Sequence, residues 1–444
     1  QHVLNGSMLF IIVTALGFAS VPEELDVAKP FVSEFSQRPT DGSFDPTTTY
    51  TAQKLNECND AGATPVIVDY DVNIDDVVAL AFLAKSRMYE IKAVIVTGTA
   101  FANPASGAAN TFRLLNLLGL DNVDVGIGPY YTQPYWDTTP GSVDFAYNRA
   151  IPKANFYSTD SLYGTHDKFL PVSERHISPP ANGGVAQPAA ADIFRKHVEA
   201  GVTTVLTLGS LTSLHKFQVT YPGSFAKIET LYSMFGAVDV EGNVFHSWPN
   251  VWKAEFNAIA DPHSAKAVLS SAIPNIILVP LDATEEVPMS PEYMATLATL
   301  ESHEGRFTSE LTHRVRNDWW CESFNPGCFY GLSAGIGSNV TAQSLLDAYF
   351  FWDPLAVAVM IDPSLVEFEE IKIEVVASTP ADRTIDGWTK RSDAGRMMKV
   401  AMHVHGDNKN KVRSMIKEAL ARQCIPNQPQ PLGVLLDKMA ACSP

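Results

Sequence analysis

Four aspartates lie within eight residues of one another, between an apolar run at 65–68 and an apolar helical pattern at 77–84. They are Asp69, Asp71, Asp75 and Asp76. Several carboxylates at the end of one buried strand cannot all stay ionised unless a positive charge compensates them. Because hard divalent cations prefer oxygen ligands, the cluster predicts a cation site at a strand-to-helix junction.

The spacing of the four aspartates directs them toward one crevice. Asp69 and Asp71 share a face of the strand, which has a period of two. Asp75 and Asp76 fall in the first turn of the following helix, where the dipole favours anions. Asn73 suits the tight turn because asparagine tolerates the left-handed conformation. A plain helix N-cap with acidic neighbours is the alternative, but it accounts only for Asp75 or Asp76.

Strand and helix patterns alternate along most of the chain. The expected strands are 66–69, 91–97, 123–126, 202–207, 228–234 and 276–280, with polar β segments at 371–376 and 398–403. The expected helices are 74–85, 107–118, 192–200, 211–217, 263–271 and 409–422, with a partly aromatic helical region at 291–329. Such alternation predicts an α/β fold: an open, mostly parallel, Rossmann-like sheet with helices on both faces.

One large domain is expected at 65–424, preceded by an extended segment at 21–64 that is rich in Ser, Thr, Pro and acidic residues. Residues 130–183 are irregular and rich in aromatics, Gly and Pro, which indicates loops over the strand ends. We expect 425–444 to be a C-terminal tail and 1–20 to be a signal peptide with its leader.

The apolar run at 8–20 ends in small residues and is typical of a signal peptide cleaved near 19–21. No Lys or Arg precedes it, so a buried helix is the alternative. N-glycosylation acceptor sequences begin at Asn5 and at Asn339, and only the second would survive cleavage. The sequence therefore predicts a secreted, extracellular glycoprotein.

The chain has 444 residues and a formal net charge of −17. Such an acidic balance argues against binding of polymeric nucleic acid through its phosphates, but not against a neutral nucleoside or sugar. Outside the N-terminal run, no apolar segment approaches the roughly 20 residues that span a bilayer. We expect no membrane partner after signal cleavage.

The five cysteines lack the paired CxxC spacing of a zinc site. In a secreted chain, Cys321 with Cys328 and Cys424 with Cys442 are possible disulfides, which would leave Cys58 free. In a reducing compartment all five would remain thiols.

Three later segments add polar groups where strands are expected to end. They are 206–212, Gly242-Asn243 together with 254–257, and 351–354. In an open parallel sheet, ligands bind outside the carboxyl ends of the strands. Each segment alone is also compatible with an ordinary turn, polar loop or N-cap.

Together with the aspartates, these segments resemble the nucleoside hydrolase family, the N-ribohydrolases of the inosine-uridine preferring type, over about 64–422. VIVDYDVNIDDVVAL is similar to the family's Asp-x-Asp-x-x-x-Asp-Asp signature, with Val72-Asn73 in place of its usual Pro-Gly. TLGSLTSL resembles the family's Gly-Pro-Leu-Thr-Asn turn, and AEFNAIADP resembles its ribose-binding segment.

The resemblance implies a Ca²⁺ ion held by Asp71, Asp76, Asp353 and the backbone carbonyl of Leu208. Asp71 would be the general base, taking a proton from a water whose acidity the cation raises. Asp69 would orient these groups from behind.

The resemblance also implies that Asp75, Asn243, Glu255 and Asn257 bind the ribose hydroxyls, with Asp353 close to them. The transition state would be oxocarbenium-like, and the acidic pocket would stabilise its positive charge. The reaction would release free base and ribose from a small-molecule nucleoside. Family members are commonly homodimers or homotetramers.

Two positions depart from the family pattern. Trp352 stands where many members carry a His that protonates the leaving base, and an indole is no useful acid. Some purine-preferring members place a Trp there, so we expect Trp352 to stack on a purine base. The alternative is that Trp352 is an ordinary residue of the protein core. Thr99 stands where the family usually has a sugar-contacting Asn. Tyr157, or its neighbour Phe156, lies near the family's other base contact.

Trp248, in the loop before the ribose-binding segment, is a further aromatic candidate for the base. The sequence thus predicts a secreted, Ca²⁺-dependent nucleosidase that favours purine nucleosides. Two alternatives are a secreted nucleoside- or sugar-binding protein that has lost turnover, and a haloacid-dehalogenase phosphatase. The phosphatase needs a downstream catalytic Lys and a second acidic pair, for which no convincing pattern is present.

Overall fold

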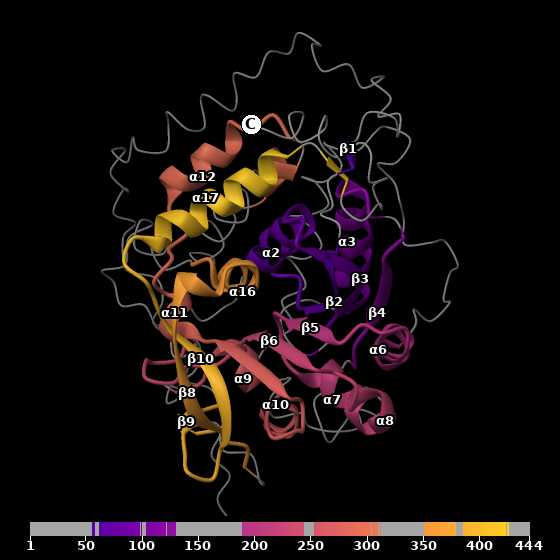
Figure 1. Ribbon diagram of the computed structural model, residues 1–444, viewed down its shortest axis with the longest axis vertical. Helices are drawn as coiled ribbons and strands as arrows, with labels where there is room; N and C mark the ends of the chain where they lie inside the picture. Colours follow the sequence, from indigo (N-terminus) through magenta and orange to yellow (C-terminus); the bar gives the residue numbers. More distant parts are fainter. Residues whose placement is uncertain are drawn as a thin grey trace, which may run out of the picture. The chain divides into compact units, whose positions relative to one another are not determined.

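The computed structural model describes residues 56–57, 62–97, 99, 104–120, 122–129, 189–243, 253–302, 304–309, 311, 350–378, 385–422 and 424–425. A nine-stranded sheet with the order β4-β3-β2-β5-β6-β7-β10-β8-β9 organises them (Figure 1). Its strands are β2 (Thr64–Tyr70), β3 (Tyr89–Val96), β4 (Asp124–Ile127), β5 (Thr204–Thr207), β6 (Thr230–Met234), β7 (Asn275–Val279), β8 (Val366–Val375), β9 (Thr389–Arg391) and β10 (Arg396–Val404). A separate parallel pair joins β1 (Asn56–Glu57) to β11 (Cys424–Ile425).

The predicted open, mostly parallel sheet is confirmed. All neighbours from β4 through β7 to β10 pair in parallel. The polar β segments predicted at 371–376 and 398–403 are parts of β8 and β10. Strand β8 runs antiparallel to both β10 and β9, so the sheet ends in an antiparallel extension.

Helices cover both faces of the sheet, as predicted. They are α2 (Ile74–Lys85), α3 (Pro104–Leu117), α6 (Ala190–Glu199), α7 (Thr212–Thr220), α8 (Pro222–Phe225), α9 (Phe256–Ala260), α10 (Pro262–Leu269), α11 (Leu281–Thr284), α12 (Pro291–Ala298), α16 (Trp352–Ile361), the 3-10 turn η2 (Pro363–Leu365) and α17 (Asn408–Ala421). Strand β2 is buried on both sides, with Val66 and Val68 in one apolar cluster and Ile67 in the other. The first cluster includes α2, α3, α16 and α17, and the second includes α6, α7 and α10.

The strand order reverses between β2 and β5. From β2 the chain proceeds through β3 to β4 on one side, and then returns to pair β5 with the other side of β2. Ligands bind at such a switch point in open α/β sheets, outside the carboxyl ends of the strands. Asp71 lies just beyond the end of β2, and Leu208 lies just beyond the end of β5.

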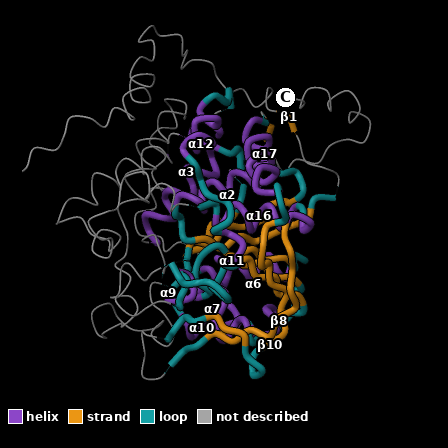
Figure 2. Tube along the Cα trace, turned by 90° about the vertical axis from the view of Figure 1, so that its left-hand side faces the viewer, coloured by secondary structure: helices purple, strands orange, loops and turns teal. Residues whose placement is uncertain are grey.

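Helix α16 and strand β9 were not predicted. Helix α16 packs against α2 (Figures 1 and 2), and nearly all of its side chains are buried. A helix that is apolar on every side lacks the 3.6-residue pattern by which a sequence reveals a helix. Strand β9 has three residues, fewer than an alternating pattern needs.

Several predictions concern residues outside the described ranges. They include the signal peptide, most of the segments at 21–64, 130–183 and 425–444, the glycosylation sites, and the cysteines other than Cys424. The helical region predicted at 291–329 contains α12 and a helical segment at 304–309, and its remainder is largely outside the described ranges. Within the described ranges, no helix has both the length and the apolar character needed to cross a membrane.

Replacement of Phe217 by alanine tests the second apolar cluster. Phe217 is fully buried and stacks on Phe194 with ring centroids 5.2 Å apart. Phe217→Ala should lower the free energy of unfolding by about 3–5 kcal/mol because it leaves a cavity. Val219→Ala, on the same helix but 58% exposed, should change it by less than about 0.5 kcal/mol. Equal urea midpoints for the two variants would contradict this packing.

Candidate active site

The turn between β2 and α2 holds Asp76 through backbone hydrogen bonds. The Asn73 side chain accepts from the Ile74 N–H (2.8 Å), and the Asn73 N–H donates to Asp76 Oδ2 (3.2 Å). The Asp71 N–H donates to the other oxygen, Asp76 Oδ1 (3.0 Å). This capping box begins the helix and fixes the Asp76 carboxylate at the switch point.

The expectation that Asn73 takes the left-handed conformation is wrong. Asn73 has φ −74° and ψ 178°, because an N-cap residue needs an extended backbone to place its side-chain oxygen over the helix. The preceding residue, Val72, turns the chain instead, with φ +66°. A β-branched residue there is strained by about 1–3 kcal/mol, and this strain lies between two of the predicted site aspartates.

Three buried carboxylates converge at the N-termini of two helices. Ligand oxygens of Asp75, Asp76 and Asp353 all lie within 4.8 Å of one another. None of the three residues is more than 3% exposed. Asp353 is in the first turn of α16, and Asp75 and Asp76 are in the first turn of α2, so both helix dipoles favour negative charge here. The structure thus brings together residues 277 positions apart in sequence.

Burial raises the pKa of Asp76 and of Asp353 well above the usual value. The charges of Asp71 and Asp75 raise both further. Asp69 also has a raised pKa because of burial, although the Thr97 hydroxyl donates to its Oδ1 (2.6 Å) and opposes that shift. Such a group of carboxylates can be fully ionised at neutral pH only with a cation among them.

The donor set fits a hard divalent cation. The buried oxygens Asp69 Oδ2 and Asn257 Oδ1 have no hydrogen-bond partner among the described residues. The Leu208 carbonyl accepts from Asn257 Nδ2 (3.1 Å), and a carbonyl oxygen has a second lone pair. Carboxylate and carbonyl oxygens without sulfur or nitrogen are the ligands of Ca²⁺ and Mg²⁺ rather than of zinc.

The compact carboxylate group differs from the predicted metal ligands in one member. Asp76 and Asp353 belong to it as expected, but the third member is Asp75 rather than Asp71. Asp71 lies beside the group, where its backbone binds Asp76. Gly209 makes this position possible, because a Cβ at Gly209 would lie 3.0 Å from the Cβ of Asp71.

The predicted ribose contacts Glu255 and Asn257 lie at the start of α9. Glu255 is its N-cap, and its carboxylate accepts from the N–H groups of Asn257 (2.8 Å), Ala258 (3.1 Å) and Gly236 (3.0 Å). Burial raises the pKa of Glu255 to about 7, although these hydrogen bonds lower it. The charge of Asp75 raises it as well, which places Glu255 near the carboxylate group.

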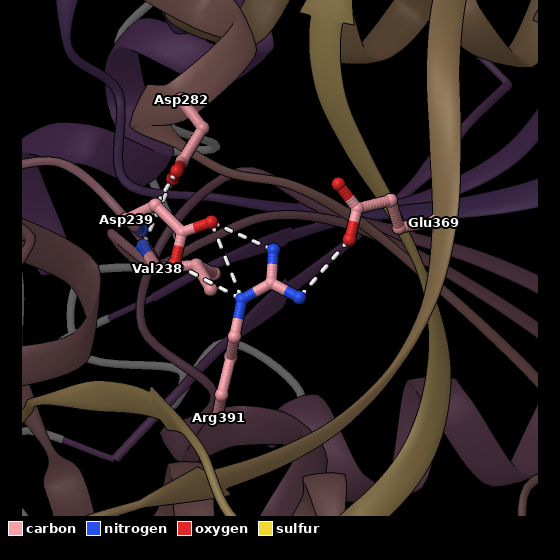
Figure 3. A network of polar contacts seen from close by, with 5 residues as sticks. All are labelled: Val238, Asp239, Asp282, Glu369 and Arg391. Carbon is pink, nitrogen blue, oxygen red and sulfur yellow. Dashed lines mark hydrogen bonds and ion pairs between the residues drawn. The ribbon is translucent and has the colours of Figure 1, made fainter.

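Asn243 joins this segment from the loop after β6, because its Oδ1 accepts from the Phe256 N–H (2.9 Å). Figure 3 shows how that loop is held. Asp282 accepts from the N–H groups of Val238 and Asp239, both at 2.8 Å, and Arg391 on β9 binds the Asp239 carboxylate (Nη2···Oδ2 2.6 Å). Asp282 and Arg391 lie outside the segments that the sequence predicts to form the site.

A second Arg391 contact reaches Glu369 on β8 (Nη1···Oε2 3.0 Å), which ties the loop to the antiparallel end of the sheet (Figure 3). No local sequence pattern predicts this network, because its residues come from four separate segments of the chain. Asp282 alone carried a signal, since it follows a predicted strand at the carboxyl edge of the sheet.

Thr99 is placed in a buried hydroxyl network. Its Oγ1 lies 2.6 Å from Ser210 Oγ and 2.7 Å from Thr212 Oγ1, and Thr212 in turn donates to Asp261 Oδ2 (2.7 Å). The sequence places Thr99 at the family's sugar-contacting position, where the ribose contact is expected to be lost or reorganised. The structure assigns its hydroxyl to neighbouring side chains on the β5–α7 turn, only 4% of the residue being exposed.

Trp352 begins α16 immediately before Asp353. It is partly buried, packs against the first apolar cluster, and lies 5.7 Å from the Phe350 ring centre. The indole thus packs against the core, and its predicted stacking on a base stays a prediction. The other aromatic candidates, Tyr157, Phe156 and Trp248, are outside the described residues.

Comparison with known proteins gives a consistent result. A family model described as inosine-uridine preferring nucleoside hydrolase matches residues 66–411. Nucleoside hydrolase 3 of Arabidopsis thaliana is 26% identical over 329 residues, covering 63% of this chain and 36% of that protein. Nucleoside hydrolase 4 of the same plant is 30% identical over 279 residues, covering 57% and 50%. The matched region therefore spans half or less of these two relatives.

A pyrimidine-specific ribonucleoside hydrolase from Photobacterium profundum is 24% identical, with 71% of this chain and 99% of that protein covered. Among solved structures, a plant nucleoside hydrolase superposes with a TM-score of 0.60 at 20% identity, covering 81% of this chain and 99% of the other. A purine-preferring ribonucleoside hydrolase from Gardnerella vaginalis gives 0.57 at 20% identity, with the same coverage. These structures share the fold of this chain.

Metal removal should make stability fall as the pH rises. A carboxyl whose pKa is raised on folding stabilises the protein below its unfolded pKa and loses that contribution as the pH passes its folded pKa. For Glu255 the window runs from 4.5 to about 7, and the raised pKa values of Asp76 and Asp353 act in the same direction.

The melting temperature of EDTA-treated protein should therefore decrease across this window, and added Ca²⁺ should restore it. Glu255→Gln, which cannot ionise, should weaken the decrease. A melting temperature that stays constant or rises between these pH values without metal would contradict the assignment.

Proposed function

The chain belongs to the inosine-uridine preferring nucleoside hydrolase family, and from this we propose that it hydrolyses the N-glycosidic bond of ribonucleosides to free base and ribose. The observation that carries the proposal is the buried group of Asp75, Asp76 and Asp353 at the switch point of the sheet. The family match spans this group and the ribose-binding segment. The family match rules out the phosphatase alternative, which rested on Asp69 and Asp71 alone.

The proposed metal is Ca²⁺. Asp71, Asp76, Asp353 and the Leu208 carbonyl would hold it, with Asp75 close by, since all of these oxygens lie at the ends of β2 and β5 or at the start of α2 and α16. When bound, the cation would neutralise the carboxylates and raise the acidity of the attacking water. The oxygen-only donor set supports this choice, as does the buried Oδ2 of Asp69, which has no hydrogen-bond partner among the described residues.

Asp71 would act as the general base by accepting the proton of the attacking water. Its backbone hydrogen bond to Asp76 holds it at the site, and Asp69 with its Thr97 hydrogen bond supports the strand end from behind. Because the sugar becomes positively charged as the glycosidic bond breaks, ionised carboxylates around it stabilise the transition state more than the ground state.

Asp75, Asn243, Glu255 and Asn257 would bind the ribose hydroxyls. The backbone hydrogen bonds that hold Glu255 and Asn243 orient both side chains before the sugar arrives. Buried polar groups that lose their partner are costly, so this arrangement should discriminate against sugars that lack a hydroxyl.

We propose a preference for purine bases. Trp352 directly precedes Asp353 at the start of α16, and the aromatic face of its indole would stack on a larger base. Family membership does not decide which base is preferred, since the relatives include a pyrimidine-specific enzyme and a purine-preferring one.

We also propose that the protein is secreted, because of the apolar run at 8–20, and that it forms a homodimer or homotetramer.

The decisive experiment compares hydrolysis of inosine, adenosine, guanosine and uridine by the same Ca²⁺-loaded protein. Purine nucleosides should give the higher kcat/KM, because stacking on an aromatic face stabilises a purine by about 1–3 kcal/mol. Preference for uridine would contradict the role of Trp352. Binding of a nucleoside without any hydrolysis would instead establish the binding-protein alternative.

Asp71→Asn tests the assignment of the base. The amide cannot accept the proton, so kcat should fall by at least about 100-fold while the melting temperature changes little. The matched control is Asp393→Asn, an exposed carboxylate near Lys372 (3.7 Å) that makes no proposed contact with substrate. A near-normal kcat for Asp71→Asn would overturn the mechanism.

A further inference from the structure

The proposed hydrolysis leaves one proton without a source. When the C1′–N bond breaks, its electron pair moves to the base nitrogen, and most nucleobases leave well only if they are protonated. The family's His position is occupied by Trp352, whose indole cannot donate a proton usefully. A replacement acid would have to lie beside Trp352, on the side of the pocket that receives the base.

Glu285 is the acidic residue whose segment is held against the start of α16, next to Trp352. It follows α11, which begins directly after β7 at the carboxyl edge of the sheet. Two backbone contacts join its segment to the start of α16: the Phe351 N–H donates to the Val287 carbonyl (2.9 Å), and Pro288 forms a β-bridge with Phe350. These contacts hold Glu285 and Trp352 near each other, and the nearby indole acts to lower the pKa of the Glu285 carboxyl.

The other end of the same segment contacts the loop that carries Asn243. The Leu281 N–H donates to the Gly236 carbonyl (2.9 Å), and the Gly236 N–H donates to Glu255. Helix α11 therefore lies between the predicted ribose contacts and the aromatic residue proposed to stack on the base. A side chain at its end is well placed to reach a base joined to that ribose.

Two carboxyl groups on this segment have opposite environments. Both oxygens of Asp282 accept backbone N–H groups at 2.8 Å, so this carboxyl is occupied by the loop after β6. Glu285 is partly buried, and burial together with the charge of Asp282 raises its pKa to about 7, against a smaller lowering effect of Trp352. A carboxyl whose pKa is raised to about 7 can hold a proton near neutral pH, as a general acid must.

We propose that Glu285 is the general acid that protonates the leaving base, with Trp352 holding the base beside it. This inference rests on the proposed hydrolase function. The Glu285 carboxyl gives its proton to a ring nitrogen as the C1′–N bond breaks, and the water oxygen bonds to C1′ while its proton passes to Asp71. Exchange with solvent then returns one proton to Glu285 and removes one from Asp71, so atoms and charges balance.

The adjacent residue Glu286 provides a matched control. Its carboxylate turns away to His403 on β10 (3.0 Å) and to Lys409 on α17 (3.2 Å), and these contacts lower its pKa. Glu286 carries the same carboxyl group as Glu285 and is its neighbour in the chain, but its charge is paired with His403 and Lys409.

The test uses two substrates with the Ca²⁺-loaded full chain. Inosine needs protonation of its leaving base, whereas 4-nitrophenyl riboside releases a nitrophenolate that needs none. Glu285→Gln should lower kcat on inosine by about 100-fold or more, with KM little changed, and should leave the nitrophenyl substrate within about 3-fold of wild type. Glu286→Gln should leave both rates near those of the wild type.

Two further readouts separate acid catalysis from a structural role. The kcat of the wild type on inosine should decline as the pH rises above 7, and this decline should be absent in Glu285→Gln. Glu285→His, which restores an ionisable group, should recover part of the rate on inosine. It also serves as the test variant if the glutamine variant does not fold.

Equal losses on both substrates, or no loss on either, would overturn the assignment of Glu285. A wild-type protein that cleaves neither substrate would overturn the proposed function and the acid with it. Failure of the proposed function can be told apart from failure of the Glu285 assignment, because only the former is seen with the wild-type protein alone.

Discussion

Asp75, Asp76 and Asp353 place carboxylate oxygens within 4.8 Å of one another in a region almost inaccessible to solvent. Without a cation their mutual repulsion and the loss of hydration both favour the neutral forms, as the raised pKa values of Asp76 and Asp353 express. The fold tolerates this repulsion because the N-termini of α2 and α16 meet at the three carboxylates and backbone N–H groups donate to Asp76. The site is therefore assembled in advance for a bound cation.

The rest of the architecture supplies rigid supports for this point. The switch between β2 and β5 brings Asp71 against Gly209, and the capping box fixes the first turn of α2. The antiparallel end of the sheet adds the Arg391 network, which holds the loop bearing Asn243 (Figure 3). A site held by several elements keeps its geometry when substrate binds, which is what preorganised electrostatic catalysis requires.

Sequence patterns succeeded where the cause of structure is local. Helix α2 was predicted at 74–85 and is observed at Ile74–Lys85, because its N-cap and apolar run lie within one short segment. The expected left-handed conformation at Asn73 was wrong. Asn73 is extended as the N-cap of α2, and Val72 has the positive φ instead. The sequence pattern also failed for α16, which is buried on every side and has no periodic polar face.

The sequence by itself determined the α/β class, and it indicated both the aspartate cluster as a candidate cation site and the segments that bear it, since each depends on composition and spacing over a few residues. Only the tertiary structure decided which side chains meet. It joined Asp353 to Asp75 and Asp76, gave the Thr99 hydroxyl to Ser210 and Thr212, and held the segment of Glu285 against the start of α16, next to Trp352. Such contacts arise from the order of strands in the sheet, and the order is settled by how buried faces pack together, which no short stretch of sequence records.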